Sequence, residues 1–178
     1  HLEELYGITV PRSEGMHTLA SVEAAARGEI DFALLLGGNL FAASPDRAFT
    51  GAALQRIGTT VYVTTKLNEG HVHGRGRTCL LLPALARDEE RQCTTQESMF
   101  NYVRVSDGGA EPASSEMRSE VEIIATLAGM ALPQGPIDFG SLRDHDAIRA
   151  AIARVVPGYE RVAEVERSRA EFEIPGRR

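Results

Sequence analysis

The chain has 178 residues, which is long enough for one α/β domain with a hydrophobic core. Its formal net charge of −6 and the lack of a block rich in lysine and arginine argue against a nucleic-acid-binding surface. The sequence has no secretory signal and no apolar run of the roughly 18–20 residues needed to cross a bilayer, so we expect no membrane segment.

The two cysteines, Cys79 and Cys93, do not have metal-ligand spacing. We therefore expect two reduced thiols in a cytoplasmic protein. The chain starts at His1 without a methionine and ends in the polar, turn-forming segment EIPGRR. From these ends we expect a piece excised from a longer protein.

The first part of the chain alternates between helical and extended patterns. Residues 18–27 have helical character, and Gly28 is a plausible stop. The side chains of Leu19, Val22 and Ala26 would share the face that packs on a sheet. The continuous apolar residues 32–36 then predict a buried parallel strand.

The alternation continues to residue 83. Pro45 and Asp46 are suited to opening a helix that Gly58 ends. The β-branched segment 59–65 predicts a second strand, and residues 78–83 predict a third. This order of elements predicts a Rossmann-like, doubly wound α/β fold with a mainly parallel sheet and helices on both faces.

The second part of the chain is less regular. We expect an extended edge segment over residues 98–106 and a loop over residues 107–115. Residues 119–132 predict an amphipathic helix. The side chains expected to point inward from this helix are Val121, Ile124, Leu127 and Ala128.

A last helix precedes the Pro157-Gly158 pair, and its candidate caps are Ser141 and Asp144. We expect residues 1–157 to form the cofactor-binding domain. Residues 158–178 are expected to be a loose, charged tail or a linker.

Polar residues follow the predicted strands, and in this fold ligands bind at the carboxyl ends of strands. Gly37 and Gly38 follow the first strand and allow both positive φ and close approach of the backbone to a ligand. Asn39 adds a donor and an acceptor. Hydroxyl and ammonium groups follow the second strand, on Thr64, Thr65 and Lys66.

Several familiar motifs are absent. The chain contains neither the G-x-G-x-x-G dinucleotide fingerprint nor the phosphate-binding motif G-x-x-x-x-G-K-[ST]. His71 and His73 lie in the segment HVHGRGR without a nearby third ligand, so we interpret them as loop histidines. The glycines and arginines of the segment favour an anion over a metal. No Ser-His-Asp or Cys-His spacing is present, and we assign no catalytic residue and no metal ligand.

A resemblance to a known family rests on three stretches: ARGEIDFALLLGGNLFAASPD, VYVTTKLNEGHVHGRGRTCLLLPALARDEE and MRSEVEIIATLAG. They resemble successive segments of the molybdopterin oxidoreductase family, most closely its formate dehydrogenase-like oxidoreductase alpha subunit branch. GGN, TKLN, LP and RSE recur there in this order, and the resemblance spans roughly residues 22–130. It implies the second Rossmann-like domain, which holds one guanine dinucleotide half of a bis(molybdopterin guanine dinucleotide) cofactor with molybdenum.

The resemblance also implies roles for the residues after the first two strands. Gly38 and Asn39 match a turn whose asparagine contacts the cofactor. Thr64 and Thr65 stand where many relatives have a Ser/Gln-Asp pair, so a guanine-binding carboxylate is missing there. Their hydroxyls and the ammonium group of Lys66 suit contacts to ribose or phosphate better.

Charged residues further along the chain match the family as well. Glu89 matches the acid after the LP strand, but Glu90 replaces the lysine that usually follows it. Arg87 or Arg91 would supply the missing cation. Glu120 stands where relatives carry an aspartate that pairs with the guanine edge, a role that a bidentate carboxylate acceptor suits. The alternative for Glu120 is a helix N-terminal acid stabilised by the helix dipole.

The resemblance implies that the parent protein is a redox enzyme, with formate as the first guess for its substrate. The partners of this fragment would be the remaining domains of the parent chain, which carry the molybdenum ligand, a possible iron–sulfur cluster and a C-terminal cap. The fragment alone would be inactive. The alternatives are a non-catalytic α/β module that binds a nucleotide or a protein partner, and an NAD-dependent dehydrogenase domain, which the missing glycine fingerprint disfavours.

Overall fold

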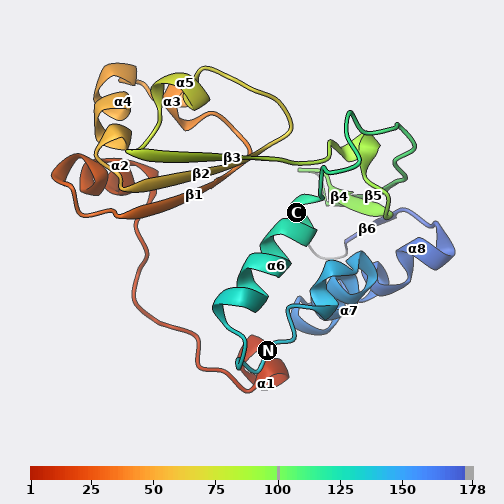
Figure 1. The fold of residues 1–178 in the computed structure, drawn as a ribbon. Helices are drawn as coiled ribbons and strands as arrows, with labels where there is room; N and C mark the ends of the chain where they lie inside the picture. Colours follow the sequence, from red (N-terminus) through yellow and green to blue (C-terminus); the bar gives the residue numbers. More distant parts are fainter. Residues whose placement is uncertain (100, 175–178) are drawn as a thin grey trace. The chain divides into compact units, whose positions relative to one another are not determined.

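A computed structural model of the protein describes residues 1–99 and 101–174, and the chain divides into two compact units (Figure 1). The parallel-sheet unit comprises Arg12–Ala84. The antiparallel-sheet unit comprises His1–Pro11 and the chain from Leu85 onward. None of the helices in the described ranges is long and apolar enough to cross a membrane.

The parallel-sheet unit is built on three parallel strands in the order β1-β2-β3. Their bounds are Phe32–Leu36 for β1, Thr59–Thr64 for β2 and Thr78–Pro83 for β3. The predicted α/β class, with a parallel sheet flanked by helices, is confirmed. These three strands follow one another without a reversal of order, so the switch point of a doubly wound sheet is not among them.

Four helices belong to this unit and gather beside its strands (Figure 1). They are α2 Thr18–Arg27, α3 Leu40–Ala43, α4 Arg47–Gln55 and α5 Gly70–His73. Helix α2 ends at Gly28, which takes the left-handed conformation with φ 79° as predicted. Helix α4 begins at Asp46, whose carboxylate accepts a hydrogen bond from the Phe49 N–H.

The core of this unit lies between the helices and one face of the sheet. Val22 and Ala25 of α2 pack against Leu54 of α4, and Ala33 of β1 packs against this cluster. Tyr62 of β2, which is 3% exposed, places its hydroxyl next to Gly74 after α5. The helices of this unit are therefore collected on the face that carries Ala33 and Tyr62.

The opposite face of β1 is exposed. Phe32, Leu34 and Leu36 are 40–59% exposed. The prediction of a buried strand is therefore wrong for this face of β1. Leu19 of α2 is also exposed, in contrast to its predicted inward position, whereas Val22 is buried.

The antiparallel-sheet unit has a second three-stranded sheet, in the order β4-β5-β6. Its strands are Thr94–Glu97, Tyr102–Ser106 and Phe172–Glu173, and both pairings are antiparallel. Strand β5 is central, so the prediction of an edge segment over residues 98–106 is wrong. Residue 100 of that segment lies outside the described residues.

Helices and helical turns surround this second sheet. In chain order they are α1 Leu2–Tyr6, η1 Arg87–Glu89, α6 Glu120–Ala131, η2 Ser141–Arg143, α7 His145–Val155, η3 Glu160–Glu164 and α8 Val165–Ser168. Both predicted long helices are present, and Asp144 rather than Ser141 caps α7 by accepting from the Asp146 N–H. Helix α6 buries Ala125, whereas Leu127, predicted to point inward, is 42% exposed.

The segment after Pro157 is folded. Val162, Val165 and Phe172 are buried in one cluster with Val103 of β5. The expectation of a loose tail is therefore wrong for residues 159–174, because their apolar side chains complete a core of this unit. Residues 175–178 of the expected tail lie outside the described residues, and a role as a linker stays a prediction.

Candidate functional site

The loops that follow β1 and β2 are joined to each other. The register places Leu36 of β1 beside Val63 of β2, so both strands end at the same edge of the sheet. The Gly37 N–H continues the ladder by donating to the Val63 carbonyl oxygen at 2.8 Å. The side-chain amide of Asn68 then donates to the Gly38 carbonyl oxygen at 3.1 Å. The structure therefore brings together the predicted residues 37–39 and 64–66.

Gly37 and Gly38 both adopt the left-handed conformation that was predicted for them, with φ of 63° and 68°. A Cβ atom placed on Gly38 would meet no atom within 4 Å. Backbone conformation, and not crowding by the protein, therefore requires glycine here. The space above Gly38 is open to a ligand.

Asn39 has a structural task in addition to the predicted one. Its side-chain oxygen accepts a hydrogen bond from the Ala42 N–H at 3.0 Å and so caps the short helix α3. Its side-chain nitrogen makes no hydrogen bond within the described part of the chain. Asn39 can therefore serve a ligand as a donor.

Of the three predicted residues after β2, one is hydrogen-bonded within the protein and two are exposed. Thr64 is buried, and its hydroxyl donates to the Lys66 carbonyl oxygen at 2.8 Å. Thr65 and Lys66 are exposed. Among residues 1–99 and 101–174, no carboxylate forms an ion pair with the Lys66 ammonium group. An anionic group at this edge would thus meet one hydroxyl and one ammonium group.

The predicted site residues do not include three that position these loops, namely Asn68, Gly70 and His71. The side-chain oxygen of Asn68 accepts from the Gly70 N–H at 2.9 Å, and its backbone N–H donates to His71 Nδ1 at 3.0 Å. Gly70 leaves room for Asn39, because a Cβ at position 70 would lie 2.7 Å from the side-chain oxygen of Asn39. No pattern in the sequence indicates these contacts, which depend on how α5 returns to the loop after β1.

The interpretation of His71 as a loop histidine is wrong. His71 lies in α5, is 5% exposed and packs edge-on against Tyr62, with 4.8 Å between the ring centroids. Its Nδ1 accepts from Asn68, so in the neutral ring Nε2 carries the proton. Nε2 is buried and has no hydrogen-bond partner in the part of the chain that the structure describes.

The other three predicted residues lie in the antiparallel-sheet unit. Arg87 is exposed and donates to the side-chain oxygen of Gln96. A carboxylate oxygen of Glu89 accepts from the Ala86 N–H at 2.8 Å and stabilises the turn η1. Glu120 is partly buried and is the first residue of α6, which is also the place of a dipole-stabilised acid. Six of the nine predicted residues thus belong to the parallel-sheet unit and these three to the antiparallel-sheet unit.

A pocket of about 530 Å³ opens beside the loop after β1. Gly37, Gly38 and Asn39 form one end of its wall. The rest of the wall is mostly apolar and comes from α2, β1, α3 and α4, with Val22, Leu35 and Leu40 among its side chains. This combination of an apolar wall with a few polar groups at one end is typical of small-molecule sites.

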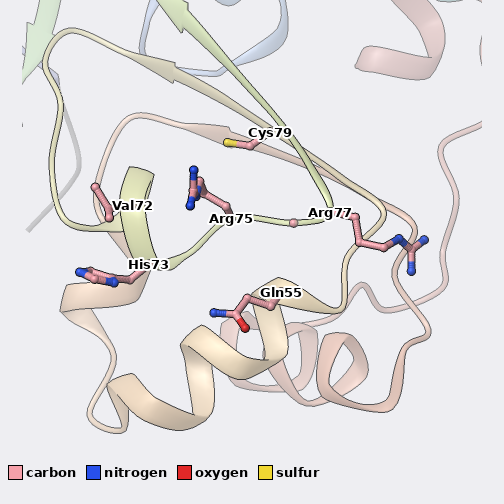
Figure 2. Close-up of a pocket in the computed structure, with 7 residues that line it drawn as sticks. Gln55, Val72, His73, Arg75, Arg77 and Cys79 are labelled. Carbon is pink, nitrogen blue, oxygen red and sulfur yellow. The ribbon is translucent and has the colours of Figure 1, made fainter.

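A second pocket, of about 440 Å³, lies between the end of α4, helix α5 and the start of β3 (Figure 2). Arg75 and Arg77 line it together with Gln55, His73 and Cys79. Within residues 1–99 and 101–174, no three histidine, cysteine or acidic side chains are placed to hold a metal ion. The Cys79 and Cys93 thiols are both free.

Comparison with known proteins relates the chain to larger ones. No family model matches it. It is 39% identical over 183 aligned residues to an uncharacterized oxidoreductase of Mycobacterium bovis and, equally, to one of Mycobacterium tuberculosis; the alignment covers 98% of this chain and 23% of each relative. It is 33% identical over 165 residues to protein YdeP of Escherichia coli, covering 89% of this chain and 22% of that protein.

The chain is similar to one segment of proteins named oxidoreductases. It spans less than a quarter of the length of the curated relatives it matches. The similarity extends through both compact units, since the alignment with the mycobacterial proteins covers almost the whole chain. Both units are therefore similar to one segment of these larger proteins.

Proposed function

We propose that this chain is the nucleotide-binding segment of a larger molybdenum-dependent redox enzyme of the formate dehydrogenase-like type. It would hold one guanine dinucleotide half of a bis(molybdopterin guanine dinucleotide) cofactor and would be inactive alone. When bound, the molybdenum centre supplies the two-electron redox chemistry. The mycobacterial relatives support the redox part of the proposal by their names, and the family resemblance of the sequence supports the cofactor.

One observation supports nucleotide binding above all: the loop with the two left-handed glycines after β1 is hydrogen-bonded to the loop after β2, which carries the exposed Lys66. Open space above Gly38 allows a diphosphate or ribose to approach the backbone. Lys66 would neutralise a phosphate, and Thr65 would add a hydroxyl. These residues fit the negatively charged part of a dinucleotide.

The apolar pocket beside the same loop fits the rest of such a ligand. Its wall offers flat apolar surface from α2 and β1, and the polar groups of Gly37–Asn39 lie at one end. A ligand with an aromatic ring system and a charged linker would use both regions. Glu120 and Glu89 are proposed as further contacts, with Arg87 supplying a cation, in a parent protein whose other domains complete the site.

Calorimetric titration of the 178-residue chain with GDP, guanosine and NAD tests the proposal. GDP should bind more tightly than NAD, with modest affinity because other domains would supply part of the contacts. Lys66→Ala should weaken GDP binding roughly tenfold, which is the usual size of a charge-assisted contact. Glu120→Ala should weaken both GDP and guanosine.

A matched pair of glycine variants separates binding from folding. Gly38 and Gly7 have similar left-handed φ, 68° and 63°, and both have open space where a Cβ would stand. Alanine at either position therefore causes comparable backbone strain, but only Gly38→Ala places a methyl group in the proposed site. Equal GDP affinity in the two variants, or a preference of the chain for NAD, would contradict the proposal.

A further inference from the structure

We propose that the pocket at the end of α5 is an anion site that binds a phosphate group, held by Arg75 with His73 and Gln55. This site is separate from the loops at the carboxyl ends of β1 and β2. The proposal does not depend on the function proposed above.

The pocket has a positive charge that the protein leaves uncompensated. Two arginines, Arg75 and Arg77, are among the residues that line it, and no acidic residue is. Among residues 1–99 and 101–174, neither arginine forms an ion pair. The chain as a whole carries a formal net charge of −6, so this concentration of positive charge opposes the general trend of the sequence. An anion would complete the local charge balance.

The backbone on either side of Arg75 is fixed. The Tyr62 hydroxyl donates to the Gly74 carbonyl oxygen at 2.5 Å, and the Gly76 N–H donates to the Thr60 hydroxyl oxygen at 3.1 Å. Neither glycine has room for a side chain. A Cβ on Gly74 would lie 2.9 Å from the Gly70 carbonyl oxygen, and one on Gly76 would lie 2.7 Å from that of Ile57.

These contacts explain the glycine-arginine alternation of this segment. Glycines let the backbone lie directly against β2 and α4, and the arginine between them is the only side chain that can project from residues 74–76. The backbone position of Arg75 is therefore set before a ligand arrives, which lowers part of the entropic cost of binding.

The side chains that surround the pocket are of the kinds that bind phosphate. Gln55, His73 and Arg75 line the pocket from α4, from α5 and from the loop after α5. Figure 2 shows that the Arg77 side chain points away from these three residues. The His73 ring is supported by Phe41, with 5.4 Å between the ring centroids. The planar guanidinium fork of Arg75 matches two phosphate oxygens, and the amide and imidazole N–H groups can donate to a third.

The direction of Arg77 provides a matched control. Arg75→Gln and Arg77→Gln remove the same charge from the same segment, but the Arg77 side chain points away from the other residues that line the pocket. Inorganic phosphate and pyrophosphate would be titrated into the 178-residue chain and its variants by calorimetry, with sodium chloride at matched ionic strength. Phosphate should bind saturably, and Arg75→Gln should weaken it roughly tenfold or more, whereas Arg77→Gln should weaken it less than about threefold.

One further variant and the titration with GDP keep the outcomes distinct. Arg75→Lys retains the charge without the fork and should give an affinity between those of the wild type and Arg75→Gln. Guanine-dependent binding of GDP should persist in Arg75→Gln, so the two proposed sites can fail independently. Equal losses in Arg75→Gln and Arg77→Gln, or no saturable binding of phosphate or pyrophosphate, would overturn the proposal.

Discussion

Replacing Tyr62 with phenylalanine removes the hydroxyl that ties β2 to the loop after α5. The ring itself is buried and packs against His71, and phenylalanine retains that contact. What is lost is the hydrogen bond to the Gly74 carbonyl oxygen, at 2.5 Å. A buried carbonyl that loses its donor costs about 1–3 kcal/mol, so we expect Tyr62→Phe to lower the free energy of unfolding of the chain by that amount near neutral pH.

The same hydroxyl predicts how stability depends on alkaline pH. Burial, with a smaller effect of the neighbouring Cys79 thiol, raises the pKa of Tyr62 from 10.0 to about 12. Because the folded-state pKa is the higher one, the stabilisation is fully present below pH 10 and is lost as the pH rises towards 12. A shift of this size corresponds to about 2.7 kcal/mol in total, of which about half is lost by pH 11.

Urea unfolding of the wild type and of Tyr62→Phe at about pH 8 and about pH 11, followed by circular dichroism, measures both effects. The difference in free energy of unfolding between the two proteins should shrink by about 1.4 kcal/mol at the higher pH. Absorbance of tyrosinate should show one late-titrating residue that the variant lacks. A difference that is the same at both pH values would refute a raised pKa, and equal stability near neutral pH would refute the buried hydrogen bond.

Two other substitutions test contacts in each unit by unfolding measurements. Arg149 is 2% exposed and forms ion pairs with two partly exposed carboxylates, so Arg149→Met should destabilise the chain by about 2–3 kcal/mol. Arg167→Met removes a partner of an exposed ion pair and should cost less than about 1 kcal/mol. Similar losses in the two variants would contradict the burial of Arg149. Gly70→Ala would bring a methyl group 2.7 Å from the side-chain oxygen that caps α3, so it should cost about 1–2 kcal/mol, and an unchanged midpoint would show that Asn39 can move aside.

The parallel-sheet unit is predictable from the sequence because its elements are encoded locally. The bounds of β1 and β3 match the predicted ranges 32–36 and 78–83, and α2 matches 18–27. Each element has its own stop, such as Gly28, and its own composition, such as the β-branched residues of β2. Local rules of this kind do not say what covers a strand, so the exposure of one face of β1 escaped prediction.

The antiparallel-sheet unit is less predictable because its sheet joins distant parts of the chain. Strand β6 has only two residues, and its pairing with β5 spans about 70 positions, with Val103 opposite Phe172. Nothing in the charged sequence after Tyr159 indicates that Val162 and Val165 are buried. Arg149 and His145, which lie on α7, both contact the backbone carbonyl of Cys93, a tertiary contact that helical periodicity does not reveal.

The candidate site shows the same division between local and tertiary information. The left-handed conformation of Gly37 and Gly38 follows from their place after a strand and was predicted. The bonds that hold the site together were not, since Asn68 reaches the Gly38 carbonyl over 30 positions of the sequence. His71 was misassigned for the same reason, because its burial against Tyr62 depends on the return of α5 to the sheet.

For Asn39, which the sequence already indicates as a ligand contact, the structure determines which of its two hydrogen-bonding groups a ligand can use. An asparagine offers both a donor and an acceptor, and the sequence alone leaves both available to a ligand. The structure assigns the side-chain oxygen to the cap of α3 and leaves the nitrogen free among the described residues. A ligand partner of Asn39 must therefore present an acceptor. The ammonium group of Lys66, on the neighbouring loop, also needs a hydrogen-bond acceptor on the ligand. Phosphate and ribose oxygens are such acceptors, whereas the N–H groups of a guanine edge are donors.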